Sequence, residues 1–516
     1  MSAHAAAILV RRESWAARAW PTVLALLITL GGTACLFASY GVSRKVFGLL
    51  AAVVAYLLIA EFSGNPRLMA LWTFFVVSPF NLSKYFGTTE LVGGEIAYRI
   101  EISDVFLAIL LIYQLRDVFA EWRPGLKVPK LMFWWGAIFA MGVAAFLAGP
   151  YRDLTGHELF RMIKMAVLFV VIVNELDRRR RMIHACAAFL LGAMIQSAGG
   201  LLEYLRGRPL GLYALGETSA ATTQILSTNS VQGEKVWRVS AFMWHPNIFG
   251  AFLGAVLPMA LALTLVKTFP FGRIYFFIAF LLGIPALVAT QSRSGWLSFA
   301  VSSILVLFLS VFHKRVQKRS MIAIPLLLVV GLCLLGAFSS KITNRLFHSK
   351  DDATLGREAF AGDAERMIAV KPIFGWGLNT YSFEVEPFMK FTIKSFEGGV
   401  LPPVHNIYLL VLAETGIVGF ACHAAIFGIL LWHAYRNLRV RDDFLYMVNV
   451  SCIAGIASVL VDGNFSFTWR MGGFQKAFWV FAAMIMAIHY WRLRNESRVL
   501  APATVRELPL QTVEAG

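Results

Sequence analysis

The sequence predicts an all-α, polytopic integral membrane protein, and three properties of the chain point to this class. Hydrophobic residues make up 58% of the 516 residues and charged residues only 15%, whereas a soluble domain averages about 25% charged residues. The mean hydropathy is +0.66. Apolar runs of roughly 17–20 residues recur between short charged loops, and most of them are long enough for a helix to cross a bilayer.

We expect about 12–14 transmembrane helices. The segment 103–115 is short for a span, and the segment 405–434 is overlong for one. The second could hold a short helix at the membrane surface, a break near Gly416 and then a span. The apolar segments are 21–40, 46–61, 68–83, 103–115, 131–149, 160–174, 182–204, 247–266, 274–290, 295–312, 321–338, 405–434, 443–461 and 473–491.

Basic residues in the loops predict which side of the membrane each loop faces. Four basic clusters, within 116–130, 178–181, 314–319 and 436–441, share one side if the spans alternate, and Arg44 and Lys45 lie on the other. Cytoplasmic loops collect lysine and arginine, so we expect this side and both termini to be cytoplasmic. The same bias explains most of the formal charge of +17, which in a soluble protein would suggest nucleic acid. We therefore expect membrane lipids, and no nucleic acid, as partners.

The outer side then carries the loops 84–102, 149–160, 205–246, 291–294, 339–404 and 462–472. The loop 339–404 contains a helix-like stretch from Gly356 to Val370 that ends before Pro372. Long loops in compact proteins are usually functional or disordered. We divide the chain into a cytoplasmic N-terminus (1–20), a transmembrane bundle (21–230), a second transmembrane region (231–338), a large periplasmic loop (339–404), C-terminal transmembrane helices (405–491) and a cytoplasmic tail (492–516).

The cysteines and the N-terminus fit a membrane protein. The five cysteines lie in apolar runs without a CxxC pair, so we expect packing residues rather than disulfides or a zinc site. They are Cys35, Cys186, Cys333, Cys422 and Cys452. Three arginines precede the run 21–40, which is long for a secretory leader, so we expect a retained signal anchor. No cluster of acidic residues and histidines suggests a metal, and nothing suggests a cofactor.

Arg293 stands at the outer end of a span, in the string Gln291-Ser292-Arg293-Ser294-Gly295-Trp296. Taken alone, it could equally be an interfacial arginine whose guanidinium reaches lipid headgroups. The small neighbours, Ser292 among them, place backbone N–H groups near a helix N-terminus, which favours an anion. Because a guanidinium matches phosphate oxygens in pairs, we expect a pyrophosphate of a lipid carrier here.

Arg238 precedes a second helix start, His245-Pro246-Asn247. It could be a simple loop residue in a turn, or a second phosphate ligand that complements Arg293. We place Asn247 among the substrate-binding candidates. His245 is more often structural in such a position than catalytic.

His405 opens a third span in the string His405-Asn406-Ile407-Tyr408-Leu409, and Glu414 follows within that span. A histidine has a pKa suited to proton transfer near neutral pH, although His405 could instead cap the helix together with Asn406. With the arginines on the same side of the membrane, catalysis is favoured. Glu414 is costly inside a membrane unless it is paired, and we count it and Asn406 as substrate-binding candidates.

The string Phe374-Gly375-Trp376-Gly377-Leu378-Asn379 has two closely spaced glycines. It lacks the strand and helix that flank a dinucleotide fingerprint. A tight loop that brings backbone near a substrate and a plain turn are equally compatible with it.

These strings, in this order, resemble the O-antigen ligase and polymerase superfamily over approximately residues 235–435. The large outer loop separates the second string from the last, as in that family. The strings are 245–250, 292–297, Gly356-Arg357, 371–379, 405–409 and Glu414-Thr415-Gly416.

The resemblance implies an integral-membrane (GT-C-like) glycosyltransferase on the periplasmic face of a bacterial inner membrane. Its donors are glycans on undecaprenyl pyrophosphate, and it requires neither a nucleotide sugar nor a metal. Family arginines hold the pyrophosphate and a histidine assists the acceptor, which here correspond to Arg238, Arg293 and His405. Arg357 falls at a further substrate-binding position.

Two questions stay open at this point. A polymerase of exopolysaccharide or O-antigen passes a growing chain to the next lipid-linked repeat, whereas a ligase passes a finished chain to lipid A core or to another outer acceptor such as a protein. Chain size and loop length favour a polymerase slightly. The rival class is a transporter or flippase of lipid-linked sugars, which should show internal repeats and polar residues at the bilayer midplane. The polar groups of this chain instead gather at the outer ends of its spans.

Overall fold

The computed structural model describes residues 64–88, 94–119, 125–218, 228–231, 234–313, 352–389 and 403–500, with the isolated positions 56, 58–60 and 316. The chain forms two compact units, Met1–Thr73 and Phe74–Gly516, and every site discussed below lies in the second. The predicted segments 21–40 and 321–338, most of 46–61, and therefore the predicted signal anchor, fall outside the described residues. Cys186, Cys422 and Cys452 are buried free thiols.

Helices dominate the described residues and follow the predicted apolar segments. They are α4 (Pro66–Val77), α5 (Ile102–Phe119), α6 (Met132–Ala148), α7 (Arg152–Glu175), α8 (Arg179–Arg206), α10 (Pro246–Thr264), α11 (Gly272–Ala289), α12 (Arg293–Val311), α15 (Asp352–Val370), α16 (Tyr381–Glu384), α17 (Ile407–Asn437), α18 (Asp443–Asp462) and α19 (Gly472–Leu500). Short 3-10 turns occupy Tyr213–Leu215, Glu386–Phe388 and Thr468–Arg470. Within the described ranges, α8, α10, α11, α12, α17 and α18 are long and apolar enough to cross a membrane. The protein is thus an all-α polytopic membrane protein.

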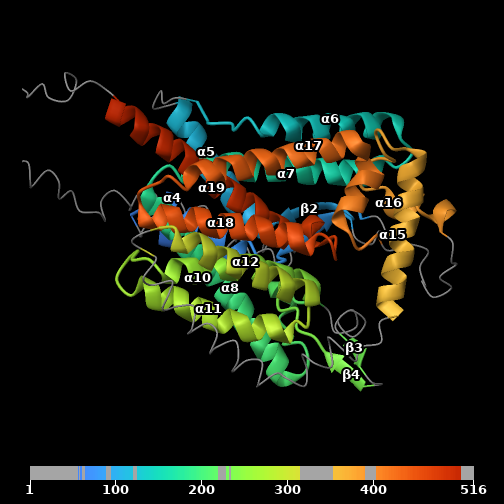
Figure 1. Ribbon diagram of the computed structural model, residues 1–516, viewed down its shortest axis with the longest axis horizontal. Helices are drawn as coiled ribbons and strands as arrows, with labels where there is room; N and C mark the ends of the chain where they lie inside the picture. Colours follow the sequence, from blue (N-terminus) through green and yellow to red (C-terminus); the bar gives the residue numbers. More distant parts are fainter. Residues whose placement is uncertain are drawn as a thin grey trace, which may run out of the picture. The chain divides into compact units, whose positions relative to one another are not determined.

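The helices pack in two groups that share an interface (Figure 1). In the first group, α10 packs against α11, α12 and α18, and α11 packs against α8. In the second, α6, α7, α17 and α19 lie side by side, and α18 and α10 contact α19. In α10, 89% of the residues in its apolar 18-residue stretch are buried, whereas in α12 only 28% of the corresponding residues are buried. The centre of the first group is therefore α10, whereas α12 turns most of its surface outward.

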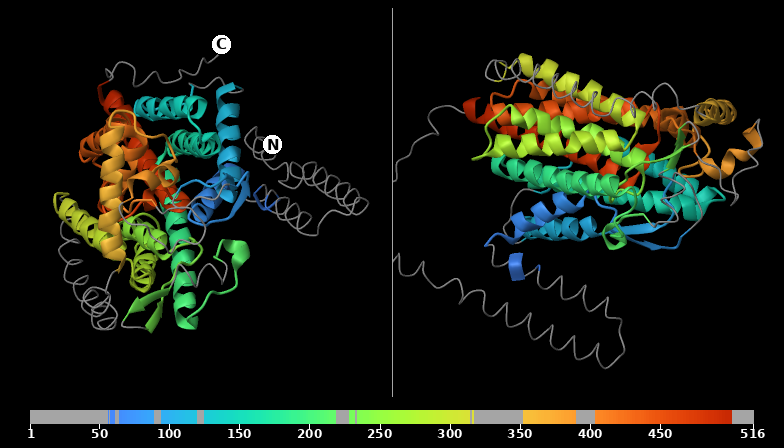
Figure 2. Two further views of the ribbon diagram at one scale, coloured as in Figure 1. Left: turned by 90° about the vertical axis from the view of Figure 1, so that its right-hand side faces the viewer. Right: turned by 90° about the horizontal axis from the view of Figure 1, so that it is seen from below.

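Shorter elements gather at one end of this bundle. The helix expected over 356–370 is present as α15, which lies across the bundle end and packs against α17. Figure 2 (left) looks onto this end, with α15 in amber. Two antiparallel hairpins lie within the predicted outer loops, β1 (Ser83–Phe86) with β2 (Tyr98–Glu101) and β3 (Thr228–Val231) with β4 (Glu234–Trp237).

The break expected near Gly416 is present within α17. Gly416 has φ 61° and ψ −168°, a conformation that is almost restricted to glycine. The backbone groups released by the break pair with the glycine-containing loop 372–377. The Ile417 and Val418 N–H groups donate to the carbonyls of Pro372 (2.8 Å) and Ile373 (3.2 Å), and those of Trp376 and Gly377 donate to Ala413 and Glu414 (both 2.9 Å). The loop thus satisfies backbone groups that a bilayer could not.

Replacing Gly416 by alanine should destabilise the protein by about 1–3 kcal/mol from backbone strain alone. A Cβ at this position would also lie 2.3 Å from the carbonyl group of Ile373. Thermal unfolding of the purified protein in detergent measures the loss. Gly428→Ala is the matched control, since a Cβ there meets nothing within 4 Å and a helical glycine gains about 0.5–1 kcal/mol on replacement by alanine. Equal stability of the two variants would contradict the assigned role of the break.

Candidate functional site

Three of the motif strings, 245–250, 292–297 and 405–409, each supply the N-cap residue of a helix. His245 caps α10, Ser292 caps α12 and Asn406 caps α17. The caps accept backbone N–H groups at 3.0 Å (His245 Nδ1 from Asn247), 3.3 Å (Ser292 Oγ from Gly295) and 2.9 Å (Asn406 Oδ1 from Tyr408). Helix N-termini carry partial positive charge and attract anions.

The three helix starts lie close together. Cβ atoms on Gly250 of α10 and Gly295 of α12 would come within 2.6 Å of the Ser292 Cβ and 2.8 Å of the Gly250 carbonyl. Both positions therefore require glycine for the helices to approach. The N-terminus of α17 is tied to the end of α18, because the Ile407 N–H donates to the Gly463 carbonyl at 2.8 Å.

Arg238 is buried between the starts of α10 and α12. Its Nε donates to the carbonyl of Thr290 at 2.9 Å, and its Nη2 donates to Asn247 Oδ1. Only 5% of its surface is exposed. The structure thus brings together two of the predicted residues, Arg238 and Asn247, and positions the guanidinium beside His245.

His405 lies near the same place. Its ring packs on Phe467 with centroids 5.1 Å apart. Burial and the charge of Arg357 on α15 lower the pKa of His405 to about 4, and burial, Arg238 and His405 lower the pKa of His245 to about 3. Both imidazoles are therefore neutral at neutral pH. The buried Nδ1 of His405 finds no hydrogen-bond partner in the part of the chain that the structure describes.

Asp462 is a member of this cluster that sequence reasoning missed. It is the last residue of α18, fully buried, and it accepts a hydrogen bond from the Thr468 hydroxyl. The side chains of Ser294 and Arg357 also interact with its carboxyl group. An acidic residue at the outer end of a predicted span was the available signal. We call Arg238, His245, Arg357, His405 and Asp462 the arginine–histidine cluster.

Strained backbone flanks this cluster. Ala241, Trp244 and Gln291 have φ of 48°, 72° and 51°, which non-glycine residues rarely adopt. All three stand within the segments that lead into α10 and α12. Such strain is stored mainly at functional sites.

The remaining predicted residues take other places. Arg293 is the first residue of α12 and is half-buried, and Ser292 is only 2% exposed as the helix cap. Glu414 is buried about two turns after the start of α17. It pairs there with Arg470 at 2.8 Å and accepts a hydrogen bond from the Tyr381 N–H at 3.3 Å. The structure thus supplies the partner that an acid inside a membrane needs, and this partner is a protein side chain.

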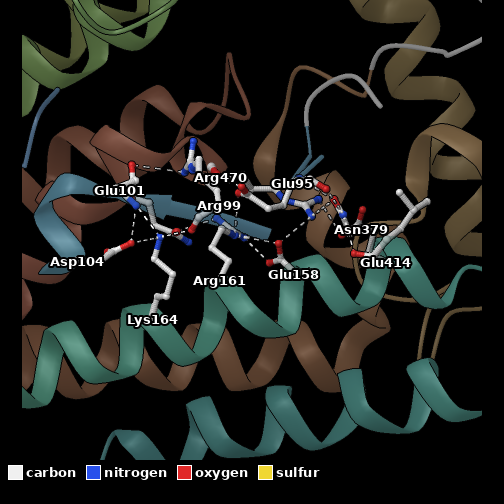
Figure 3. A network of polar contacts seen from close by, with 12 residues as sticks. Glu95, Arg99, Glu101, Asp104, Glu158, Arg161, Lys164, Asn379, Glu414 and Arg470 are labelled. Atoms are coloured by element: carbon white, nitrogen blue, oxygen red, sulfur yellow. Dashed lines mark hydrogen bonds and ion pairs between the residues drawn. The ribbon is translucent and has the colours of Figure 1, made fainter. Parts of the chain in front are cut away.

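Glu414 belongs to a larger buried network of charged side chains (Figure 3). It contains five carboxylates and five basic side chains, each acid with a basic partner: Glu95–Arg99, Glu101–Lys476, Asp104–Lys164, Glu158–Arg161 and Glu414–Arg470. Asn379 joins two parts of it, since its Oδ1 accepts from Arg470 at 3.2 Å and from the Glu95 N–H at 3.1 Å. These contacts connect four of the predicted outer loops.

Comparison with known proteins finds one family model and two relatives that resemble this chain. Residues 278–424 match the family model described as O-antigen ligase, which contains Arg293, Arg357 and His405 but not Arg238. The chain is 25% identical to an O-antigen ligase of Pseudomonas aeruginosa over 346 residues, 65% of this chain and 72% of the relative. It is also 25% identical to an uncharacterized protein of Haemophilus influenzae over 207 residues, 37% of this chain and about half (49%) of that relative. The resemblance predicted from the motif strings is confirmed.

Proposed function

From the O-antigen ligase domain carried by residues 278–424, we propose that this protein is an inner-membrane glycosyltransferase. It transfers or polymerises glycans from undecaprenyl-pyrophosphate-linked donors on the periplasmic face. The observation that carries the proposal is the arginine–histidine cluster, where the buried Arg238, the half-buried Arg357 and two neutral histidines meet near three helix N-termini. The basic loops then lie in the cytoplasm with both termini.

The arginines bind the pyrophosphate of the donor. Arg238 lies beside the starts of α10 and α12, Arg293 is the first residue of α12, and Arg357 lies on α15, where its charge acts on His405. Guanidinium groups match phosphate oxygens in pairs, and the helix N-termini add backbone N–H groups. Negative charge grows on the pyrophosphate as its bond to the anomeric carbon breaks, so these groups stabilise the transition state more than the bound donor. No metal ion is needed for this step.

His405 acts as general base on the acceptor. An acceptor hydroxyl attacks the anomeric carbon, its proton passes to the neutral imidazole, and lipid pyrophosphate leaves with the bonding electrons. The bound pyrophosphate itself favours the protonated imidazole, because an opposite charge nearby raises the pKa of a histidine. The carboxylate of Asp462 partly offsets the positive charge of Arg357. Asn247 and Asn406 hold Arg238 and the start of α17 in place.

Lipid-linked glycans in a deletion strain test this function and identify the acceptor. Mass spectrometry of extracted lipids should find single repeat units on the lipid carrier if the protein is a polymerase. Long chains on the carrier would instead identify a ligase to lipid A core or another outer acceptor. An unchanged lipid-linked pool with intact surface polysaccharide would overturn the proposal. Movement of labelled lipid-linked sugar by the purified protein without bond formation would favour a transporter.

The pH dependence of catalysis should report His405. The imidazole must be neutral to accept a proton, so kcat/KM should fall as the pH falls through its pKa of about 4. Because the charge of Arg357 holds this pKa down, Arg357→Gln should move the acid limb to higher pH. Lys371→Gln removes a positive charge from an exposed position outside the cluster and should leave the limb in place. Identical acid limbs in the wild type and Arg357→Gln would contradict the assignment.

A further inference from the structure

We propose that a separate cavity beside the arginine–histidine cluster binds an uncharged sugar ring of one of the two glycans that are joined. This inference rests on the proposed function and adds the part of the substrate that the cluster does not hold. The cavity has a volume of about 290 Å³ and lies between the β1–β2 hairpin, the start of α10 and the start of α19. Ligand pockets measure roughly 300–1,000 Å³, so this cavity suits a small group rather than a chain.

The hairpin turns one face toward this cavity. Side chains alternate along a strand, and Tyr85, Arg99 and Glu101 line the cavity while Tyr98 and Ile100 are exposed on the other face. Tyr85 stands directly opposite Arg99 across the hairpin. One side of the cavity is therefore formed by polar side chains from one face of the hairpin, while Phe80, Met243 and Ile248 add apolar surface elsewhere in the lining.

Charge in the cavity wall is balanced. Arg99 and Arg470 face Glu95 and Glu101, and each of these groups has its partner in the buried network. An anion would gain little electrostatic binding energy in this cavity, in contrast to the arginine–histidine cluster. A hydroxyl group both donates and accepts hydrogen bonds, so a ring that carries several hydroxyls can use guanidinium and carboxylate groups side by side. The chemistry of the wall thus fits a neutral polyol and not the pyrophosphate.

Trp244 connects this cavity to the site of transfer. Its indole lines the cavity, is 41% exposed, and belongs to the residue immediately before His245. Its backbone is strained, with φ of 72°. The apolar face of an aromatic ring can pack against the C–H face of a sugar ring, and its N–H can bond a hydroxyl. A sugar ring held by Trp244 would therefore lie next to the arginine–histidine cluster, because Trp244 directly precedes His245 in the chain.

The polar groups of the cavity are fixed before a ligand binds. Asn379 holds the backbone of Glu95 on both sides, accepting its N–H at 3.1 Å and donating to its carbonyl at 2.9 Å. The guanidinium of Arg99 packs so closely on Gly472 that a Cβ there would lie 2.2 Å from its Nη2. Rigid donors and acceptors lose little freedom on binding, which favours recognition.

Steady-state kinetics in proteoliposomes test the proposal. The donor is lipid-linked glycan extracted from the deletion strain, and donor and acceptor are titrated separately. Trp244→Gly removes the indole at a φ that glycine adopts readily, and Tyr85→Phe removes one hydroxyl from the wall. We expect Trp244→Gly to raise one KM about tenfold, and Tyr85→Phe to raise the same KM by less, with kcat nearly unchanged. A raised acceptor KM assigns the ring to the acceptor, and a raised donor KM assigns it to the donor.

Ile100→Ala is the matched control, because it alters the exposed face of the same hairpin, and both KM values should stay at wild-type levels. Unchanged KM values in Trp244→Gly and Tyr85→Phe, with an active wild type, would overturn this inference alone. A wild-type protein that forms no glycosidic bond would overturn the proposed function and the inference with it.

Discussion

Replacing His405 by alanine should remove glycan transfer and leave the protein folded and inserted. A positioned general base contributes about 10²–10⁴-fold to a rate, so the rate of transfer should fall by that factor relative to the wild type. Arg293→Ala should lower transfer by about 10²–10³-fold, the usual cost of removing one group that stabilises transition-state charge. Both rates are measured with lipid-linked donor in membranes, after protein amount and size-exclusion profile have been matched to the wild type.

Two replacements elsewhere serve as controls for this prediction. His433→Ala removes another partly buried histidine from α17, and Arg273→Ala removes an arginine at the start of another helix, α11. Both should retain transfer, since neither lies in the arginine–histidine cluster or at the start of α12, where Arg293 stands. Full product from both His405→Ala and Arg293→Ala would eliminate the proposed mechanism.

Arg470→Met should cause the largest loss of stability. The side chain of Arg470 is 8% exposed and pairs with Glu414 at 2.8 Å, so its removal leaves a buried carboxylate without its main partner. Removing one member of a buried pair typically costs about 3–5 kcal/mol. Thermal unfolding in detergent, followed by size-exclusion chromatography, should show a clear drop in the midpoint temperature.

The double variant Arg470→Met/Glu414→Met should recover part of this loss, because it removes both buried charges. Arg178→Met provides the surface comparison, since Arg178 pairs with Asp177 at 3.7 Å while its side chain is 69% exposed. That change should stay within about 0.5 kcal/mol of the wild type. An Arg470→Met protein as stable as Arg178→Met would show that the network does not depend on this pair.

The helices could be predicted because apolar length and loop charge are local properties of the sequence. The break at Gly416 and the helix over 356–370 were visible for the same reason: a glycine and a proline act on their own neighbours. The motif strings could be placed at helix starts, and Arg238 and Asn247, nine residues apart, could be grouped.

The partners of buried charges could not be predicted in this way. Glu414 was recognised as costly unless paired, but Arg470 lies 56 residues away, in the segment between α18 and α19. Asp462 stands at the end of a span, where an acid usually meets solvent, and only the fold buries it beneath Thr468. Sequence patterns report what a residue costs in a membrane, whereas the packing of distant loops decides which residue offsets that cost.

The break in α17 also has a consequence for synthesis at the ribosome. The loop 372–377, which pairs with the released backbone groups of α17, precedes that helix in the chain. It therefore leaves the ribosome before α17 does. The order of translation thus makes the partner available before the broken helix needs it. Moving the loop to a position after α17 by circular permutation would remove this advantage without changing any contact of the finished fold.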